Sequence, residues 1–71
     1  MTADGYPPAR FCAGQLVKVA GPTGIGTIRH LGEVGRIDAS YRLLITGVVC
    51  HSVVFPDGSE ALYDEPNLEP P

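Results

Sequence analysis

The stretch VVCHSVVFPDGSEALYD, residues 48–64, decides the fold of this 71-residue chain. Residues 48–55 are β-branched and aromatic apart from three central positions, a composition that favours an extended strand. Residues 56–59 place Pro and Gly in an order that is typical of a tight turn. Residues 60–64 then return as a second strand, so the stretch predicts a β-hairpin.

Three further segments extend this pattern in both directions. Residues 15–20 alternate Val17 and Val19 with Lys18, the period of two that indicates a half-buried strand. Another strand is expected to begin over residues 34–38, and residues 41–47 continue it either as buried strand or as a loop packed onto the sheet. Residues 66–70 should close the chain through one short turn that places Leu68 in the core.

Four or five short strands are too few to bury both faces of a flat sheet. Curling the sheet into a small barrel gives one core from one set of faces and removes exposed edges. We therefore predict an all-β chain, a small SH3-like barrel over residues 11–71 preceded by a flexible, disordered tail over residues 1–10. Nine Gly and seven Pro interrupt the chain at intervals that suit turns rather than helices.

Cysteine content and hydropathy suggest the compartment. Cys12 and Cys50 are too few for a disulfide framework. The first ten residues contain no apolar segment of a signal peptide, and no apolar run approaches the ~18 residues of a membrane span. We expect a reduced, cytoplasmic protein with no membrane span.

Charge is distributed unevenly along the chain. The net charge is −3, but the first 42 residues carry five cations and three acids, whereas the remainder carries five acids and no cation. Such blocks bear on the choice of partner rather than on the fold.

Two motifs resemble a cofactor site or a catalytic site, but their residues do not support either function. Residues 21–27 resemble a phosphate-binding loop but lack its Lys and its Mg²⁺-binding hydroxyl. Cys50 and His51 are adjacent in a strand, so they point to opposite faces and do not form a catalytic dyad or chelate one ion together. His51 shares a face with Val53 and Phe55, which predicts a core residue. We expect no enzyme activity, no catalytic residue and no cofactor, and the sequence leaves open whether Cys12, His30, Cys50 or His51 ever bind metal.

Residues 14–21 resemble the KOW motif of nucleic-acid-binding modules. Such modules neutralise phosphates with clustered Lys and Arg. This chain has one Lys, four scattered Arg and an acidic C-terminal third, so we do not expect nucleic acid as its partner. A KOW-like module remains an alternative.

Four segments together resemble a known group of small barrels. They are Phe11-x-x-Gly14-x-x-Val17-x-Val19, Glu33-Val34-Gly35-x-Ile37, the run 52–58 and Glu65-x-x-Leu68-Glu69. They are similar to SH3-like barrels of the electron-transport accessory type. That group includes PsaE-type subunits of photosystem I, the variable chain of ferredoxin–thioredoxin reductase, the nitrile hydratase β-subunit and NifZ-type accessory proteins. The basic docking cluster of a ferredoxin-facing subunit is reduced here to Lys18, Arg29, Arg36 and Arg42.

The resemblance implies a non-catalytic, protein-binding accessory subunit or maturation factor of a larger redox or metalloenzyme complex. Partners of such barrels meet the first long loop and the turn after the third strand, here residues 23–31 and 56–59. The expected partner-binding residues are Arg29, His30, Arg36, Tyr41 and Tyr63. They are taken as exposed, with Tyr41 and Tyr63 as amphipathic contacts, and the alternative for Tyr63 is a cap on the core with its hydroxyl in water. The other alternative is an SH3-barrel enzyme with a pore shared between subunits, and the sequence leaves a homo-oligomer open.

Overall fold

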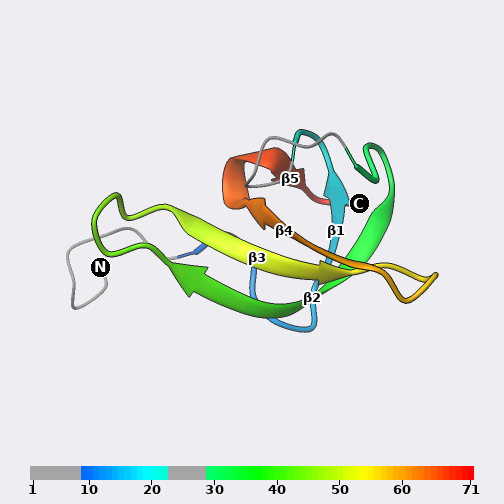
Figure 1. The fold of residues 1–71 in the computed structure, drawn as a ribbon, viewed down its shortest axis with the longest axis horizontal. Helices are drawn as coiled ribbons and strands as arrows, with labels where there is room; N and C mark the ends of the chain where they lie inside the picture. Colours follow the sequence, from blue (N-terminus) through cyan, green and yellow to red (C-terminus); the bar gives the residue numbers. More distant parts are fainter. Residues whose placement is uncertain (1–8, 23–28) are drawn as a thin grey trace.

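The structure, a computed structural model, describes residues 9–22 and 29–71. These residues form five strands and one turn of 3-10 helix: β1 Leu16–Val19, β2 Val34–Arg42, β3 Val49–Val54, β4 Glu60–Asp64, η1 Glu65–Asn67 and β5 Leu68–Glu69. The strands make one antiparallel sheet in the order β4-β3-β2-β1-β5 (Figure 1). The prediction of an all-β chain is confirmed. No helix in the described part of the chain is long and apolar enough to cross a membrane.

The alternation seen in the sequence sets the inner face of β1. Val17 and Val19 are 0% and 1% exposed, whereas Leu16 lies outside and Lys18 is half-buried. The same period of two continues on β2, where Gly35 and Ile37 point inward. One face of the sheet therefore supplies the core, as the pattern predicted.

β2 is the long strand that joins the two halves of the sheet. Its residues 34–36 pair with β1, and its residues 36–42 pair with β3. A β-bulge between Ile37 and Ala39 shifts the register and bends the strand at this change of partner. The path of residues 38–47 is thus a strand to Arg42 followed by a turn.

The tip of the β2–β3 hairpin corrects one expectation. Residues 43–45 were expected to be buried or packed onto the sheet, but Leu44 is 75% exposed and Ile45 97% exposed. The hairpin arm projects beyond the other strands of the sheet (Figure 1), and among the described residues its tip stays largely exposed. Both expected placements of this apolar run are wrong.

The β3–β4 turn lies where the sequence placed it. Gly58 has a φ of 87°, a left-handed conformation that Gly adopts without strain. The carboxylate of Asp57 accepts hydrogen bonds from the backbone N–H and the hydroxyl of Ser59, at 2.9 and 2.6 Å. The turn is therefore fixed by its own side chains.

The chain end is tied into the core by a short turn, also as predicted. Pro66 lies in the first turn of η1, where its missing N–H costs nothing, and the N–H of Leu68 donates to the carbonyl of Glu65. Leu68 is 2% exposed, and β5 pairs with β1.

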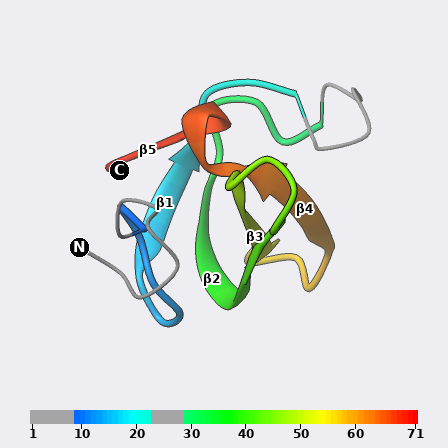
Figure 2. The same cartoon turned by 90° about the vertical axis from the view of Figure 1, so that its left-hand side faces the viewer.

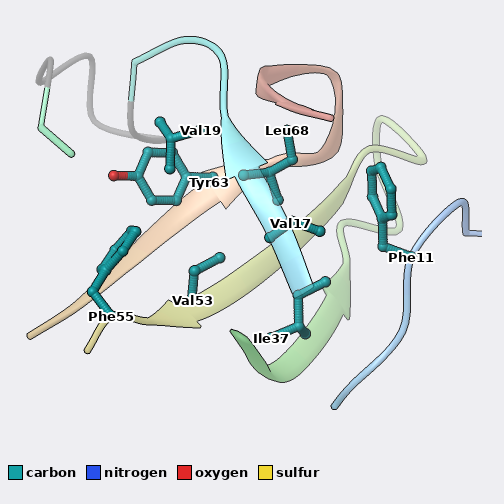
Figure 3. Packing of buried hydrophobic residues seen from close by; sticks show 8 residues of the cluster. All are labelled: Phe11, Val17, Val19, Ile37, Val53, Phe55, Tyr63 and Leu68. Carbon is teal, nitrogen blue, oxygen red and sulfur yellow. The ribbon is translucent and has the colours of Figure 1, made fainter. Parts of the chain in front are cut away.

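The core consists of eight residues, which come from the five strands, the residue directly after β3 and the segment before β1. Figure 3 shows their side chains gathered between β1 and the β2–β3–β4 side of the sheet: Phe11, Val17, Val19, Ile37, Val53, Phe55, Tyr63 and Leu68. The sheet curls so that β1 and β4 lie on opposite sides of this interior (Figure 2). Closure into an SH3-like barrel stays a prediction, because β4 and β5 are the ends of the strand order.

Residues 1–8 of the predicted tail lie outside the described residues. Arg10, the last residue of that predicted tail, donates its backbone N–H to the carboxylate of Glu65 at 2.9 Å. Its guanidinium lies 5.1 Å from the centre of the Phe11 ring.

Candidate functional site

A surface groove of about 570 Å³ runs along the bent part of β2. Most of its lining is apolar, and it is bordered by β1 on one side and by the start of the β3–β4 turn on the other. We call it the β2 groove, and its lining residues are Leu16, Val34, Gly35, Arg36, Ile37, Asp38, Val54, Phe55 and Pro56.

Gly35, one of the lining residues, marks the place where β2 comes closest to β3. A Cβ atom at this position would lie 2.6 Å from Cγ1 of Val53, 2.8 Å from the carbonyl oxygen of Val54 and 3.0 Å from Cδ1 of Phe55. Only a residue without a side chain lets β2 approach β3 and the Phe55 ring this closely.

Two exposed apolar side chains and two opposite charges line the groove. Leu16 and Val34 are 44% and 38% exposed. Arg36 pairs across the strands with Leu16 and Val54, and its guanidinium donates to the carbonyl of Gly14 at 2.8 Å. Asp38 lies in the bulge beside them. The groove can therefore bury an apolar side chain and pair a charge at its edge.

His30 joins the two loops that the sequence singled out. Its ring stacks on Phe55 with centroids 3.9 Å apart and planes 10° apart. Its Nε2 lies 3.2 Å from the hydroxyl oxygen of Ser59, and its Nδ1 lies 3.2 Å from the carboxylate of Glu33. The backbone of His30 is left-handed, with a φ of 59°, which is uncommon for a residue with a Cβ. The loop ending at residue 31 and the turn at 56–59 thus meet beside the groove, through Phe55.

Asp57 belongs to the same corner. The hydroxyl of Ser59, and then its backbone N–H, hold the pKa of the Asp57 carboxyl below its usual value. This carboxylate is therefore charged at neutral pH and adds an acidic group to the turn.

Among the expected partner-binding residues, Arg29, Arg36 and Tyr41 are exposed, and His30 is half-buried. Arg36 lines the groove and His30 borders it, whereas Tyr41 lies on the hairpin arm opposite Cys50. The expectation that Tyr63 is exposed is wrong. Residues 23–28 of the expected first-loop contact lie outside the described residues, as does most of the phosphate-loop-like run.

Tyr63 belongs to the core instead. It is 0% exposed, and its hydroxyl donates to the carbonyl of Arg29 at 2.7 Å. Burial raises the pKa of its phenol. The sequence of β4 does not show which face is buried, because apolar residues lie on both faces and Leu62 faces outward.

A second histidine network was missed in the sequence. Glu65 Oε2 accepts hydrogen bonds from the N–H groups of Arg10 and Phe11 and lies 2.8 Å from Nε2 of His51. Nε2 of His51 therefore carries the proton. In the neutral ring Nδ1 then accepts a hydrogen bond from the hydroxyl of Ser40, with the two atoms 2.7 Å apart. Glu65 is buried, which its place among the acidic residues of the C-terminal third does not indicate.

This network holds β2, β3, η1 and the segment before β1 together. The order of hydroxyl, imidazole and carboxylate matches that of a hydrolase triad. However, the His51 ring is 0% exposed, as predicted for a core residue, and Phe11 packs edge-on against it. The groups fill each other's hydrogen-bonding capacity, which is the arrangement that stabilises a buried polar cluster.

The thiols lie apart from this network. Cys50 is buried on the other face of β3, where its thiol donates to Asp64 at 3.2 Å, and Cys12 is exposed. Burial, with a smaller contribution from Asp64, raises the pKa of Cys50 to about 11. Over the ranges 9–22 and 29–71, no three His, Cys, Asp or Glu residues are grouped so that they could hold a metal ion.

Comparisons of this chain with protein-family models, with curated proteins and with solved structures find no match.

Proposed function

We propose that this chain is a non-catalytic accessory subunit or maturation factor that binds a larger redox or metalloenzyme complex through the β2 groove. The observation that carries the proposal is the groove itself, an apolar hollow of about 570 Å³ on a chain of 71 residues. The class of partner follows the resemblance to electron-transport accessory barrels. Two free thiols, one of them exposed, support a reducing compartment, and we place the protein in the cytoplasm.

The groove favours a partner that offers an apolar side chain flanked by carboxylates. Leu16 and Val34 are already partly exposed, so burying them against a partner removes apolar surface from water. Arg36 at the groove and exposed Arg29 on the neighbouring loop supply the positive charges for carboxylates. Such charges at the rim of an interface steer association more than they hold the complex together.

Site-specific photocrosslinking in cells tests the proposal. A photoreactive amino acid at position 16 should yield an adduct with one larger protein. The same amino acid at position 44 is the matched control, because Leu44 is apolar and more exposed than Leu16 but lies on the hairpin tip. Adducts at both positions, or at position 44 alone, contradict the assignment of the groove.

Native mass spectrometry of the complex separates the alternative functions. The proposal predicts one copy or a few copies of this chain bound to a larger protein. A homotetramer without another protein would support the pore enzyme, and bound RNA would support the KOW-like module. Either result would contradict the accessory function.

A further inference from the structure

β4 forms one edge of the sheet. It is the last strand in the order β4-β3-β2-β1-β5, and within the part of the chain that the structure describes it pairs with β3 alone. In Figure 2 it lies at the right-hand side of the curled sheet, away from β1 and β5. An edge strand of five residues is long enough to receive another strand.

The register identifies the backbone groups that face outward. The N–H of Phe55 donates to the carbonyl of Ser59 at 2.9 Å, so these two residues form a hydrogen-bonded pair. Hydrogen-bonded and non-hydrogen-bonded pairs alternate along an antiparallel ladder, and this ladder runs to residue 64 without a shift. The N–H and C=O groups of Glu60, Leu62 and Asp64 therefore point away from β3.

The side chains of these three residues lie on the outer face of the sheet. Leu62 is 45% exposed and Glu60 is exposed, whereas Asp64 is half-buried. Ser52 and Cys50, on the outer face of β3, donate to one oxygen each of Glu60 and Asp64, so one oxygen of each carboxylate is held toward β3 and the other does not take part in these hydrogen bonds. The edge thus presents acid, Leu, acid at alternate positions.

A second copy of β4 is a poor occupant of this edge. An antiparallel pairing centred on Leu62 would place Glu60 of each copy opposite Asp64 of the other. Like charges directly opposite each other destabilise a strand pair, whereas opposite charges stabilise it. No Lys or Arg follows residue 42, so nothing in this half of the chain neutralises the edge.

We propose that the outer edge of β4 binds an extended basic segment of a partner protein as an added antiparallel strand. Lys or Arg side chains of that segment lie opposite Glu60 and Asp64, and an apolar side chain lies opposite Leu62. Backbone hydrogen bonds supply the affinity and the alternating side chains supply the selectivity. This site is separate from the β2 groove, because it shares no residue with the groove lining.

A synthetic peptide of sequence Thr-Lys-Thr-Val-Thr-Lys-Thr, labelled with fluorescein, tests the backbone part of the proposal. Its central Val would lie opposite Leu62 and donate its N–H to β4, whereas the N–H groups of the two flanking Thr would point to solvent. N-methylation of the central Val should weaken binding about tenfold, and N-methylation of the flanking Thr should leave affinity within about twofold. Equal affinity of the two methylated peptides would overturn the proposal, as would no binding of the parent peptide.

Charge reversal tests the selectivity. Glu60→Lys should abolish binding of the Lys peptide. The double variant Glu60→Lys/Asp64→Lys should instead bind a peptide in which Asp replaces both Lys. Glu69→Lys is the matched control, because it makes the same charge change on β5, away from the β4 edge. If Glu69→Lys weakens binding as much as Glu60→Lys does, the peptide responds to net charge only and the proposal is wrong.

Amide hydrogen exchange read by NMR locates the peptide. Exchange at Glu60, Leu62 and Asp64 should slow when the peptide binds, and Arg36→Glu should leave this protection unchanged. Protection that appears instead around the β2 groove, or that is lost in Arg36→Glu, would contradict the edge site. Failure at the edge therefore stays distinguishable from failure of the groove.

Discussion

Gly35→Ala tests whether the close approach of β2 to β3 shapes both the core and the β2 groove. The added methyl would lie 2.6 Å from Cγ1 of Val53 and 2.8 Å from the carbonyl oxygen of Val54, whereas ordinary contacts of a Cβ lie at 3.4–4 Å. Val53 is 0% exposed, so its side chain cannot turn out to solvent without leaving the core. The carbonyl of Val54 is part of the backbone that pairs with Arg36, so moving it disturbs the β2–β3 ladder.

The expected loss follows from two opposing effects. Overpacking of a core typically costs about 1–3 kcal/mol, and two contacts shorter than 3.0 Å, one of them to the backbone, place Gly35→Ala near the upper end of that range. Replacing Gly by Ala restricts the unfolded chain and returns about 0.4–1 kcal/mol. We expect the free energy of unfolding to fall by about 2 kcal/mol, and Tm to fall by roughly 10 °C for a domain of this size. This is a large part of the roughly 4–10 kcal/mol typical of a chain of such length.

Urea unfolding followed by circular dichroism measures this loss. Gly32→Ala is the control, because Gly32 has a φ of 81° and its Cβ would meet no atom within 4 Å, so only backbone strain of about 1 kcal/mol is expected. In Gly35→Ala/Val53→Ala the contact with the Val53 side chain is removed, so the double variant should be more stable than the sum of the single effects predicts. A Gly35→Ala variant as stable as the parent would refute the reasoning.

Two other regions give further predictions. His51→Leu leaves the Ser40 hydroxyl without its partner and removes one donor from the buried Glu65 carboxylate. In the same urea assay the free energy of unfolding should therefore fall by about 3 kcal/mol, whereas Ser40→Ala should lower it by about 1 kcal/mol. Because the pKa of Cys50 is raised from 9.0 to about 11, the unfolded chain ionises first and stability should fall as the pH rises from 9 to 11. Urea titrations should show this fall flattened in Cys50→Ala, and an identical pH profile of the variant would disprove it. In the absence of reductant, a thiol reagent at pH 8 should label Cys12 in the folded protein and should label Cys50 only after denaturation. If no free thiol is recovered after denaturation, the two cysteines form a disulfide and the prediction is wrong.

Local patterns in the sequence were sufficient for the strands and turns. Val17 and Val19 alternate with Lys18, and Pro, Asp, Gly and Ser at residues 56–59 fix a turn by chemistry that acts within four residues. These signals depend on neighbours along the chain, so they can be read without knowing the fold. The end of β2 could not be placed in this way, because its pairing with β3 and the bulge at Asp38 are set by strands that are distant in sequence.

The site residues show the same division. Arg29 and Arg36 were expected to be exposed and are exposed. The burial of Glu65 depends on N–H groups 54 and 55 residues away in the chain, which no local pattern reveals. The β2 groove combines residues of β1, β2, β3 and the start of the β3–β4 turn, which no local pattern in the sequence brings together. A polar residue placed among apolar ones, as His51 is in 49–55, was the one signal that could have prompted a search for a buried partner.

Hydrogen–deuterium exchange of the purified complex, read by mass spectrometry, tests the central claim most directly. The partner is the protein captured from position 16. Binding through the β2 groove predicts slower exchange in peptides that cover residues 34–38 and 54–56, with exchange at the hairpin tip, residues 43–47, unchanged. Arg36→Glu should reduce this protection at low salt by slowing association. Protection confined to residues 43–47, or no protection along β2, would contradict the claim that the groove binds the partner.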